Sequence, residues 1–260
     1  MPTPKILLLL AGSVLASSIS VGLAKAQQPA PAGIVCPVTH ENLVNALHQA
    51  VKPAGGPTNG GFDNNEWAAV VNREGVICAI AFSGAHWDQQ WFGSRSIAAE
   101  KAYTANAFSS NSAAASTANL FWPTQPGGIL YGLLTSNPLN AAALYAGKAE
   151  QYGTDADPLI GKRIGGTTSF GGGLALYQDK KIVGGLGLSG DSSCADHNVA
   201  WRIRQTLKLD SAPKGISGER NDGIIYDIGS DGRSKSGFGH PKCQGTEDQI
   251  AHQIGASTTE

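Results

Sequence analysis

Glycine placed inside apolar runs is the feature that most constrains this fold. The run from Ile182 to Gly190 reads IVGGLGLSG, and the chain holds 34 glycines in 260 residues, well above the usual share of about 7%. These glycines stand in short runs between apolar stretches, which excludes collagen, coiled coil and general disorder. Glycine within a strand permits the close approach of another backbone or of a flat ligand. We therefore expect a glycine-bearing sheet with a closely packed partner.

An alanine-rich segment predicts that partner. Residues from Ser96 to Phe108 include IAAEKAYTANAF, a helical pattern with so little side-chain bulk that the helix can lie close on a sheet. Two further helices and two β-hairpins surround it in the sequence. One helix is capped by Thr39 and has Leu43, Leu47 and Val51 on one face, and the other runs from Asp196 to Leu207. The first hairpin joins Trp67 to Val71 with Val76 to Phe82. The second hairpin joins Leu174 to Tyr177 with Ile182 to Ser189. This order predicts an α+β fold, a single domain with a central antiparallel sheet packed by helices.

The N-terminal segment has the features of a secretory signal peptide. Lys5 precedes an apolar run from Ile6 to Leu15, and Ala24-Lys25-Ala26 supplies the small-x-small cleavage pattern. Serines interrupt this run, and a membrane span needs about 20 apolar residues. We expect residues 1–26 to be removed and the mature protein to be periplasmic or secreted, with no membrane partner. Residues 27–35 read as a disordered lead-in.

The charge balance limits the possible partners, and the composition separates a domain from a C-terminal arm. Lys plus Arg number 19 and Asp plus Glu number 20, so the chain has no basic excess to neutralise phosphates, and nucleic acid is excluded as a partner. Residues 36–210 form the predicted domain. Residues 211–260 contain few large apolar side chains, which predicts a C-terminal arm rather than a second core.

Export decides how the cysteines are interpreted. The mature part contains Cys36, Cys78, Cys194 and Cys243, and an even number in an oxidising compartment favours disulfides. Three pairings are possible, of which proximity in the sequence favours 36–78 with 194–243. The second bridge would pin the arm to the domain and bring His197 near His240. The spacings C-x₂-H and H-x₂-C also permit a zinc site, but export favours the disulfide.

Other motifs carry less weight. Gly185, Gly187 and Gly190 match the dinucleotide fingerprint, but they lie inside a hairpin rather than at a strand-to-helix turn, so the match is taken as accidental. Neither the G-x-S-x-G nucleophile motif nor the H-E-x-x-H zinc motif occurs. Trp87, Trp91 and Phe92 stand beside His86, and this aromatic cluster either lines an apolar ligand site or covers the sheet edge.

Four segments occur in an order that resembles a known family. They are Lys101-Ala-Tyr-Thr-Ala-Asn-Ala-Phe108, Gln125-Pro-Gly-Gly-Ile-Leu-Tyr-Gly-Leu133, Phe170-Gly-Gly-Gly-Leu-Ala-Leu176 and Ile182-Val-Gly-Gly-Leu-Gly-Leu-Ser-Gly190. Together they resemble the GlcG/HbpS-like haem-binding family over roughly Leu43 to Leu207. The resemblance implies a compact domain with a central antiparallel sheet, common assembly into homo-oligomers, and haem binding or haem degradation in some members.

The chain also departs from the short pattern of that family. Its 140–164 segment is longer, Ser192-Ser193-Cys194-Ala195-Asp196-His197 follows the last strand, and a cysteine-containing arm is added. These additions resemble a larger exported subgroup. Because of them, no iron ligand is carried over from the family, and the candidate histidines are chosen on their chemistry.

The leading hypothesis is an exported protein that binds haem without a covalent bond, for sequestration, redox sensing or degradation. His197 is the preferred iron ligand, because the expected helix start keeps its ring neutral and Asp196 can orient the other ring nitrogen. His240 is the second cofactor-binding candidate. The remaining candidates in the domain are His40, His48 and His86.

Two other functions stay open at this point. One is an exported enzyme that acts on a small organic molecule, with His197 and Asp196 as an acid–base pair. The other is a structural subunit of an oligomer that binds no ligand. For each histidine, a surface or helix-start position satisfied by solvent is the plainer alternative.

Overall fold

The computed structural model describes residues 35–258. Its centre is one sheet of four antiparallel strands in the order β2-β1-β4-β3. The strands are β1 (Trp67–Asn72), β2 (Ile77–Phe82), β3 (Gly173–Gln178) and β4 (Lys181–Ser189). The signal-peptide prediction for residues 1–26 falls outside the described residues, as does most of the 27–35 lead-in.

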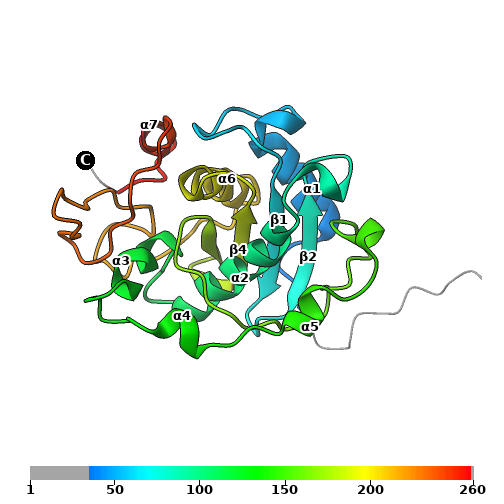
Figure 1. Ribbon diagram of the computed structural model, residues 1–260, viewed down its shortest axis with the longest axis horizontal. Coiled ribbons are helices and arrows are strands. Elements are labelled where there is room, and N and C mark those ends of the chain that lie inside the picture. The colour runs from blue at the N-terminus through cyan, green and yellow to red at the C-terminus, as the bar shows by residue number, and fades with distance from the viewer. Residues whose placement is uncertain (1–34, 259–260) are drawn as a thin grey trace, which may run out of the picture. The chain divides into compact units, whose positions relative to one another are not determined.

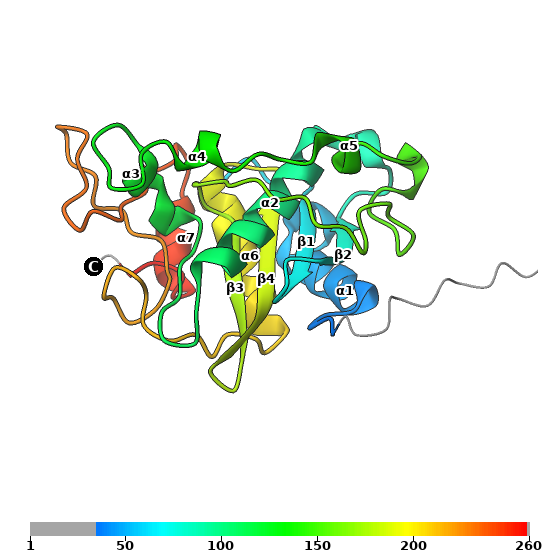
Figure 2. The same cartoon turned by 90° about the horizontal axis from the view of Figure 1, so that it is seen from below.

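Two hairpins build this sheet. β1 pairs with β2 and β3 pairs with β4, and the hairpins join where β1 lies beside β4, with Trp67 opposite Ser189 and Asn72 opposite Gly184. Figure 2 shows the four strands side by side. The predicted hairpins and the α+β class are therefore confirmed.

Helix α2 (Gly93–Phe108) lies across one face of the sheet (Figure 2). The contact is set by glycines of β4, since a Cβ added at Gly185 would stand 2.2 Å from Ala102 O and one at Gly187 only 2.0 Å from Ala98 O. No side chain other than hydrogen fits there, so the alanine-rich helix packs backbone against backbone. On this face the glycines allow a helix to approach the sheet closely, which is one of the two roles expected from the sequence.

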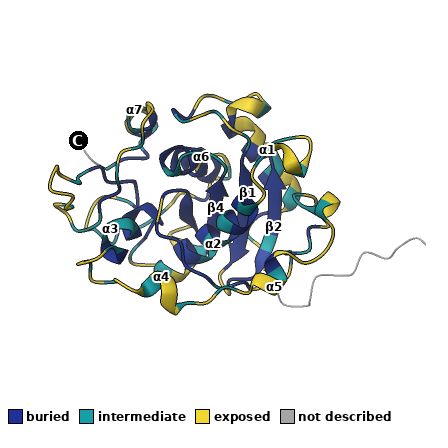
Figure 3. Ribbon diagram, viewed as in Figure 1, coloured by how far each residue is buried: buried dark blue, intermediate teal, exposed yellow. Residues whose placement is uncertain are grey.

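Helices α1 (His40–Ala50) and α6 (Ser193–Thr206) cover the opposite face. Thr39 caps α1 by accepting a hydrogen bond from Asn42 N, and Ser192 caps α6 in the same way from Ala195 N. The predicted helix from Asp196 begins three residues earlier, because the cap is Ser192. Figure 3 shows the sheet and the inner sides of these helices as the buried part of the fold.

Short helices connect these elements (Figure 1). They are η1 (Lys52–Ala54), η2 (Trp87–Gln89), η3 (Ala118–Leu120), α3 (Phe121–Thr124), α4 (Leu133–Ser136), α5 (Ala141–Leu144), η4 (Ala149–Gln151) and α7 (Glu247–Gln253). The long segment 140–164 is largely irregular, as expected. It is tied to α2 by the buried guanidinium of Arg95, which donates to both carboxylate oxygens of Asp157 and to Leu144 O.

The C-terminal arm contributes to the main core. Ile224, Tyr226, Ala251 and Ala256 are buried in the same apolar cluster as α1 and α6. Arg204 of α6 also forms a buried two-point ion pair with the arm residue Asp222, at 2.7 and 2.8 Å. The arm forms no second core, but it packs more tightly than its composition suggests, because its few apolar residues are the ones that face the domain.

Both predicted disulfides are present. Cys36 bonds to Cys78, and Cys194 bonds to Cys243. The described part of the chain has no free cysteine, so the zinc alternative is wrong. Within residues 35–258, no helix has the length and apolar character that a bilayer span requires.

Candidate functional site

His197 lies inside the protein rather than on a ligand surface. Its ring on α6 is fully buried, and Nε2 lies 3.2 Å from Ala256 O. Because a carbonyl only accepts, Nε2 carries the hydrogen, while Nδ1 has no partner in the described chain. Burial lowers the pKa of His197 to about 3. The ring is neutral, as expected, but burial rather than the helix end is the main cause.

Asp196 does not orient His197. Its Oδ2 accepts a hydrogen bond from the buried Lys101 Nζ at 2.6 Å, and its Oδ1 accepts from Asp191 N at 2.9 Å. Successive residues of a helix point about 100° apart, so the two side chains leave α6 in different directions. The expected hydrogen bond between Asp196 and His197 is not formed. The carboxylate of Asp196 instead pairs with Lys101, a partner that the sequence pattern did not indicate.

Lys101, Asp196 and Glu66 form a buried charged cluster. Lys101 also donates to Leu188 O at 2.8 Å and lies 4.9 Å below the centre of the Phe170 ring. Burial raises the pKa of Asp196 to about 6 and that of Glu66 well above its usual value. Glu66 Oε2 has no hydrogen-bond partner among the described residues. These groups form an acid–base cluster in the interior.

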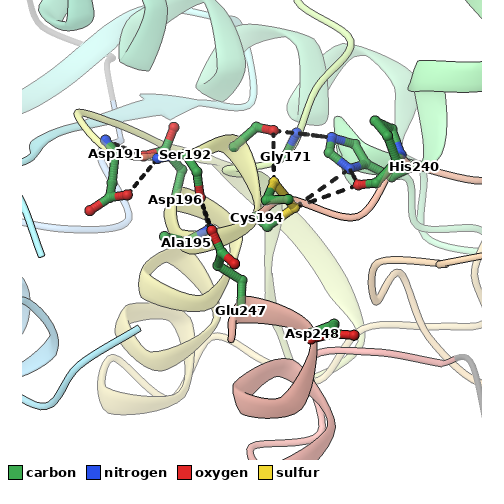
Figure 4. The surroundings of a disulfide bond; sticks show 12 residues. Gly171, Asp191, Ser192, Cys194, Ala195, Asp196, His240, Glu247 and Asp248 are labelled. Atoms are coloured by element: carbon green, nitrogen blue, oxygen red, sulfur yellow. Dashed lines mark hydrogen bonds between the residues drawn. A yellow bond between two sulfur atoms is a disulfide. The ribbon is translucent and has the colours of Figure 1, made fainter. Parts of the chain in front are cut away.

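His240 is also buried, in the arm, beside the Cys194–Cys243 disulfide (Figure 4). Its Nδ1 donates to Pro241 O at 2.8 Å and its Nε2 accepts from Gly171 N at 3.2 Å. Burial lowers the pKa of His240 to about 4. Both ring nitrogens are therefore engaged, and a cavity of about 280 Å³ beside the ring is small.

The predicted proximity of the two histidines is seen around Gly171. A Cβ added at Gly171 would stand 3.2 Å from His197 Cβ, while the amide of the same residue bonds to His240. The disulfide and the glycine-rich loop thus bring His197 and His240 to one place. That place is a packed interface between α6 and the arm.

An open hollow lies elsewhere, at the end of the sheet near β2. Two adjoining depressions of about 390 and 400 Å³ share Trp87 and Tyr152, and together they are called the aromatic cleft. The first is lined by Phe82, Gly84, Ala85, His86, Trp87, Glu150, Tyr152, Gly153 and Thr154, and the second by Trp87, Phe92, Tyr145, Gly147, Ala149 and Tyr152.

Aromatic rings form the walls of this cleft. Trp87 meets Phe92 edge-on with ring centres 6.2 Å apart, and Phe92 meets Tyr145 edge-on at 5.8 Å. Phe92 and Tyr145 are exposed even so. The predicted cluster of Trp87 and Phe92 with His86 thus lines a hollow, whereas Trp91 does not take part. Tyr145 and Tyr152 come from the irregular segment 140–164, where no sequence periodicity pointed to them.

His86 borders the cleft with a defined ring. Its side chain is 57% exposed, and Nδ1 lies 2.6 Å from Asp88 Oδ1. Because an ionised carboxylate only accepts, the Asp88 contact places the hydrogen on Nδ1. The capping box of the turn also brings the backbone N–H of Gln89 against the His86 side chain. The turn is held by Gln89 Oε1, which accepts from Ala85 N at 2.7 Å and from His86 N at 3.1 Å. Nε2 is then the nitrogen with a lone pair for a metal.

The other histidines differ in their access to this cleft. His40 of α1 bonds through Nε2 to the carbonyl of Gly153 at 3.0 Å, so it stands just behind the wall. His48 and His252 are exposed on α1 and α7 and line neither hollow. In the described chain no group of three His, Cys, Asp or Glu side chains is arranged to hold a metal ion.

The chain is similar to a known protein family and to several solved structures. Residues 63–204, more than half of the chain, match the family described as haem degrading protein HbpS-like. Similar solved structures include a PduOC:haem complex, at 22% identity over 66% of this chain and 94% of that chain, with a TM-score of 0.44. Protein ORFY of Klebsiella pneumoniae is 20% identical over 71% and 95%, with a TM-score of 0.44. A double mutant of HbpS from Streptomyces reticuli is 15% identical over 76% and 99%, at 0.42. The search of curated proteins found no match.

Proposed function

The chain belongs to the HbpS-like family of haem-degrading proteins, and from this premise we propose that it is an exported protein that binds haem in the aromatic cleft. The aromatic lining of that cleft carries the proposal. Its residues fall between Phe82 and Thr154, inside the matched segment 63–204. The cleft combines residues 82–92 with residues 145–154 of the 140–164 segment, in which this chain is longer than the short family pattern.

The residues of the cleft suit haem. Haem is flat and mainly apolar, and sites for such ligands are concave and lined by aromatic side chains with few polar groups. Trp87, Phe92, Tyr145 and Tyr152 supply such walls, and His86 supplies an imidazole with a lone pair. When bound, haem would contribute iron redox and oxygen chemistry. The protein's part is to bind the macrocycle and to limit the access of water.

Export is the second element of the proposal. Two disulfides favour an oxidising compartment, and the signal-peptide pattern of residues 1–26 points the same way. We expect a mature chain that begins near Gln27, in the periplasm or outside the cell. Intact-mass analysis of the exported protein tests this, and a membrane-bound chain that retains residues 1–26 would contradict it.

Haem titration of the mature, oxidised protein tests the function itself. The expected result is a saturable Soret band with a stoichiometry of one haem per chain. The control is protein-free buffer with the same haem concentration, which gives the spectrum of unbound haem. A titration that shows only this free-haem spectrum would refute the proposal.

One observation favours a second candidate, an exported enzyme for a small organic molecule. Lys101, Asp196 and Glu66 form a buried cluster in which burial raises the pKa of both acids, as is common where a protein transfers protons. The predicted acid–base pair of Asp196 with His197 would then be replaced by Asp196 with Lys101. Turnover by haem-free protein that is lost in Lys101→Met, while the fold is retained, would support this candidate.

Self-association is also proposed. Ile129, Tyr131 and Leu134 are exposed apolar residues close together in the sequence, and exposed apolar patches often mark contacts between proteins. Light scattering at micromolar concentration is the measurement. A monomer mass would count against a homo-oligomer, including one that serves only as a structural subunit.

A further inference from the structure

We infer that His86 holds the haem iron through Nε2 and that Asp88 positions the imidazole for it. The inference rests on the proposed haem binding and deepens it by naming the ligand. Two observations carry it. One is the state of the ring nitrogens in all histidines of the chain, and the other is the carboxylate behind His86.

An iron ligand needs a ring nitrogen that is free and that lies where haem can reach it. The chain has six histidines, and two of them, His197 and His240, are buried against α6 and the arm. A haem could reach either ring only if the arm left the domain, which would break the disulfide or the Arg204–Asp222 pair. For these two rings, binding to iron requires unfolding of packed structure.

The remaining histidines differ in their position relative to the aromatic cleft. His48 and His252 lie on α1 and α7 and border neither hollow of the aromatic cleft. His40 is near the cleft, but its Nε2 is bonded to Gly153 O. His86 is thus the histidine of the described chain that lines the cleft and has a nitrogen lone pair directed away from its internal partner.

Asp88 lies where it can position the His86 ring. A metal-bound histidine commonly donates its other ring N–H to a carboxylate, which fixes the tautomer and increases the basicity of the ligating nitrogen. The 2.6 Å contact between His86 Nδ1 and Asp88 Oδ1 has this arrangement before any ligand is bound. Both groups are exposed, so the protein gains little stability from the pair. Positioning of the ring is the use that the contact suggests.

The walls of the cleft complete the site. His86 lines the first hollow, while Trp87 belongs to both hollows, so a flat macrocycle placed against His86 also meets the rings of Trp87, Phe92 and Tyr145. The turn η2 that carries Trp87 is held by Gln89. The imidazole and the Trp87 ring are therefore carried by the same hydrogen-bonded turn.

The test is a haem titration of the mature chain and of five variants, at His86, Asp88, His48, His40 and His197. His86→Ala should weaken haem binding by at least tenfold and move the Soret band, because the iron loses its protein ligand. Added imidazole should restore the wild-type spectrum of this variant. Asp88→Asn should weaken binding by roughly tenfold and change the spin-state signature of the bound iron, whereas a merely structural role would leave that signature unchanged.

His48→Ala and His40→Ala are the matched controls. His48→Ala removes an exposed imidazole away from the cleft, and His40→Ala removes one behind its wall; both should keep the wild-type Soret position. Circular dichroism checks that every variant is folded, and both His86 and Asp88 are exposed enough for replacement without loss of the core.

The outcomes separate this inference from the proposed function. If the wild type binds no haem, the function fails and the inference fails with it. If the wild type binds haem and His86→Ala binds it with unchanged affinity and spectrum, the inference alone is overturned. The same holds if His40→Ala or His197→Gln, rather than His86→Ala, removes the ligand signature in folded protein.

Discussion

The histidines of this protein stand in two contrasting settings. At the interface of α6 and the arm, His197 and His240 are buried, and burial lowers their pKa values to about 3 and about 4. At the aromatic cleft, His86 is mostly exposed, and its ring is held by a carboxylate at 2.6 Å. The first setting keeps the rings neutral by excluding water, and the second keeps one nitrogen available while water still has access.

A histidine ring can be neutral without being available to a ligand. A ligand for iron needs a lone pair on a surface that the macrocycle can reach. The rings of His197 and His240 are neutral, but they are buried and do not lie on a surface that the macrocycle can reach. We therefore expect changes at the arm interface to alter stability, and changes at the cleft to alter haem binding.

Removal of the Cys194–Cys243 bridge should have the largest effect on stability. The double variant Cys194→Ala/Cys243→Ala opens a loop of 49 residues, which costs about 4 kcal/mol in the chain-entropy description. Chemical denaturation of oxidised protein measures the loss. At a temperature where the variant is folded, its haem spectrum should match the wild type.

The matched control is Cys36→Ala/Cys78→Ala, which opens a loop of 42 residues far from the arm. Both double variants should lose similar stability, but only the first should make His240 reactive toward an imidazole-modifying reagent. A Soret band that disappears with the Cys194–Cys243 bridge in folded protein would mean that haem binds at the arm after all.

The pH dependence of stability should distinguish the two settings next. The folded-state pKa values of His197 and His240 lie below the usual 6.5, so their contribution is complete above pH 6.5 and is lost as the pH falls toward 4. Asp196 has a pKa raised to about 6, so its contribution has the opposite sign and is lost as the pH rises from about 4 to about 6. The raised pKa of Glu66 acts in the same direction as that of Asp196. The wild type should therefore show a flattened profile.

His240→Gln removes one side of that balance. Relative to the wild type, the free energy of unfolding of the variant should increase on acidification by about 1.4 kcal/mol per pH unit between pH 6 and pH 4.5. Urea denaturation at several pH values gives this slope, which is independent of any constant loss of packing. His48→Gln is the exposed control, and an equal slope change there would show that burial is not the cause.

The smallest expected effect is at the cleft wall. Phe92→Ala removes a ring that meets both Trp87 and Tyr145, and haem affinity should fall about tenfold, equivalent to 1.4 kcal/mol. Trp91→Ala is the control, since Trp91 is 67% exposed and lines neither hollow. Titration of both variants measures the difference, and equal losses would show that the wall is not specific.

Local pattern was sufficient for most elements of this fold. Hairpins, the capped helix after Thr39 and the alanine-rich helix all follow from periodicity and turn residues within a few positions. The glycines of β4 indicated close backbone packing because only a missing Cβ permits it. Sequence proximity and export together indicated both disulfide pairings.

The site was harder to predict because its parts are distant in the sequence. His197 looked accessible beside a glycine-rich strand, but Ala256 and the arm, about 60 residues later, cover it. Asp196 looked like its partner, but Lys101, 95 residues earlier, takes the carboxylate. Tyr145 and Tyr152 complete the cleft from a segment without periodicity.

The helices and strands, the two hairpins, the cysteine pairing and the family resemblance could all be inferred from the sequence, because each depends on local pattern or on residue type. Which histidines are buried and which one faces a hollow became clear from the packing of the folded chain. Burial depends on which distant segment packs over a side chain, and no local pattern records that contact.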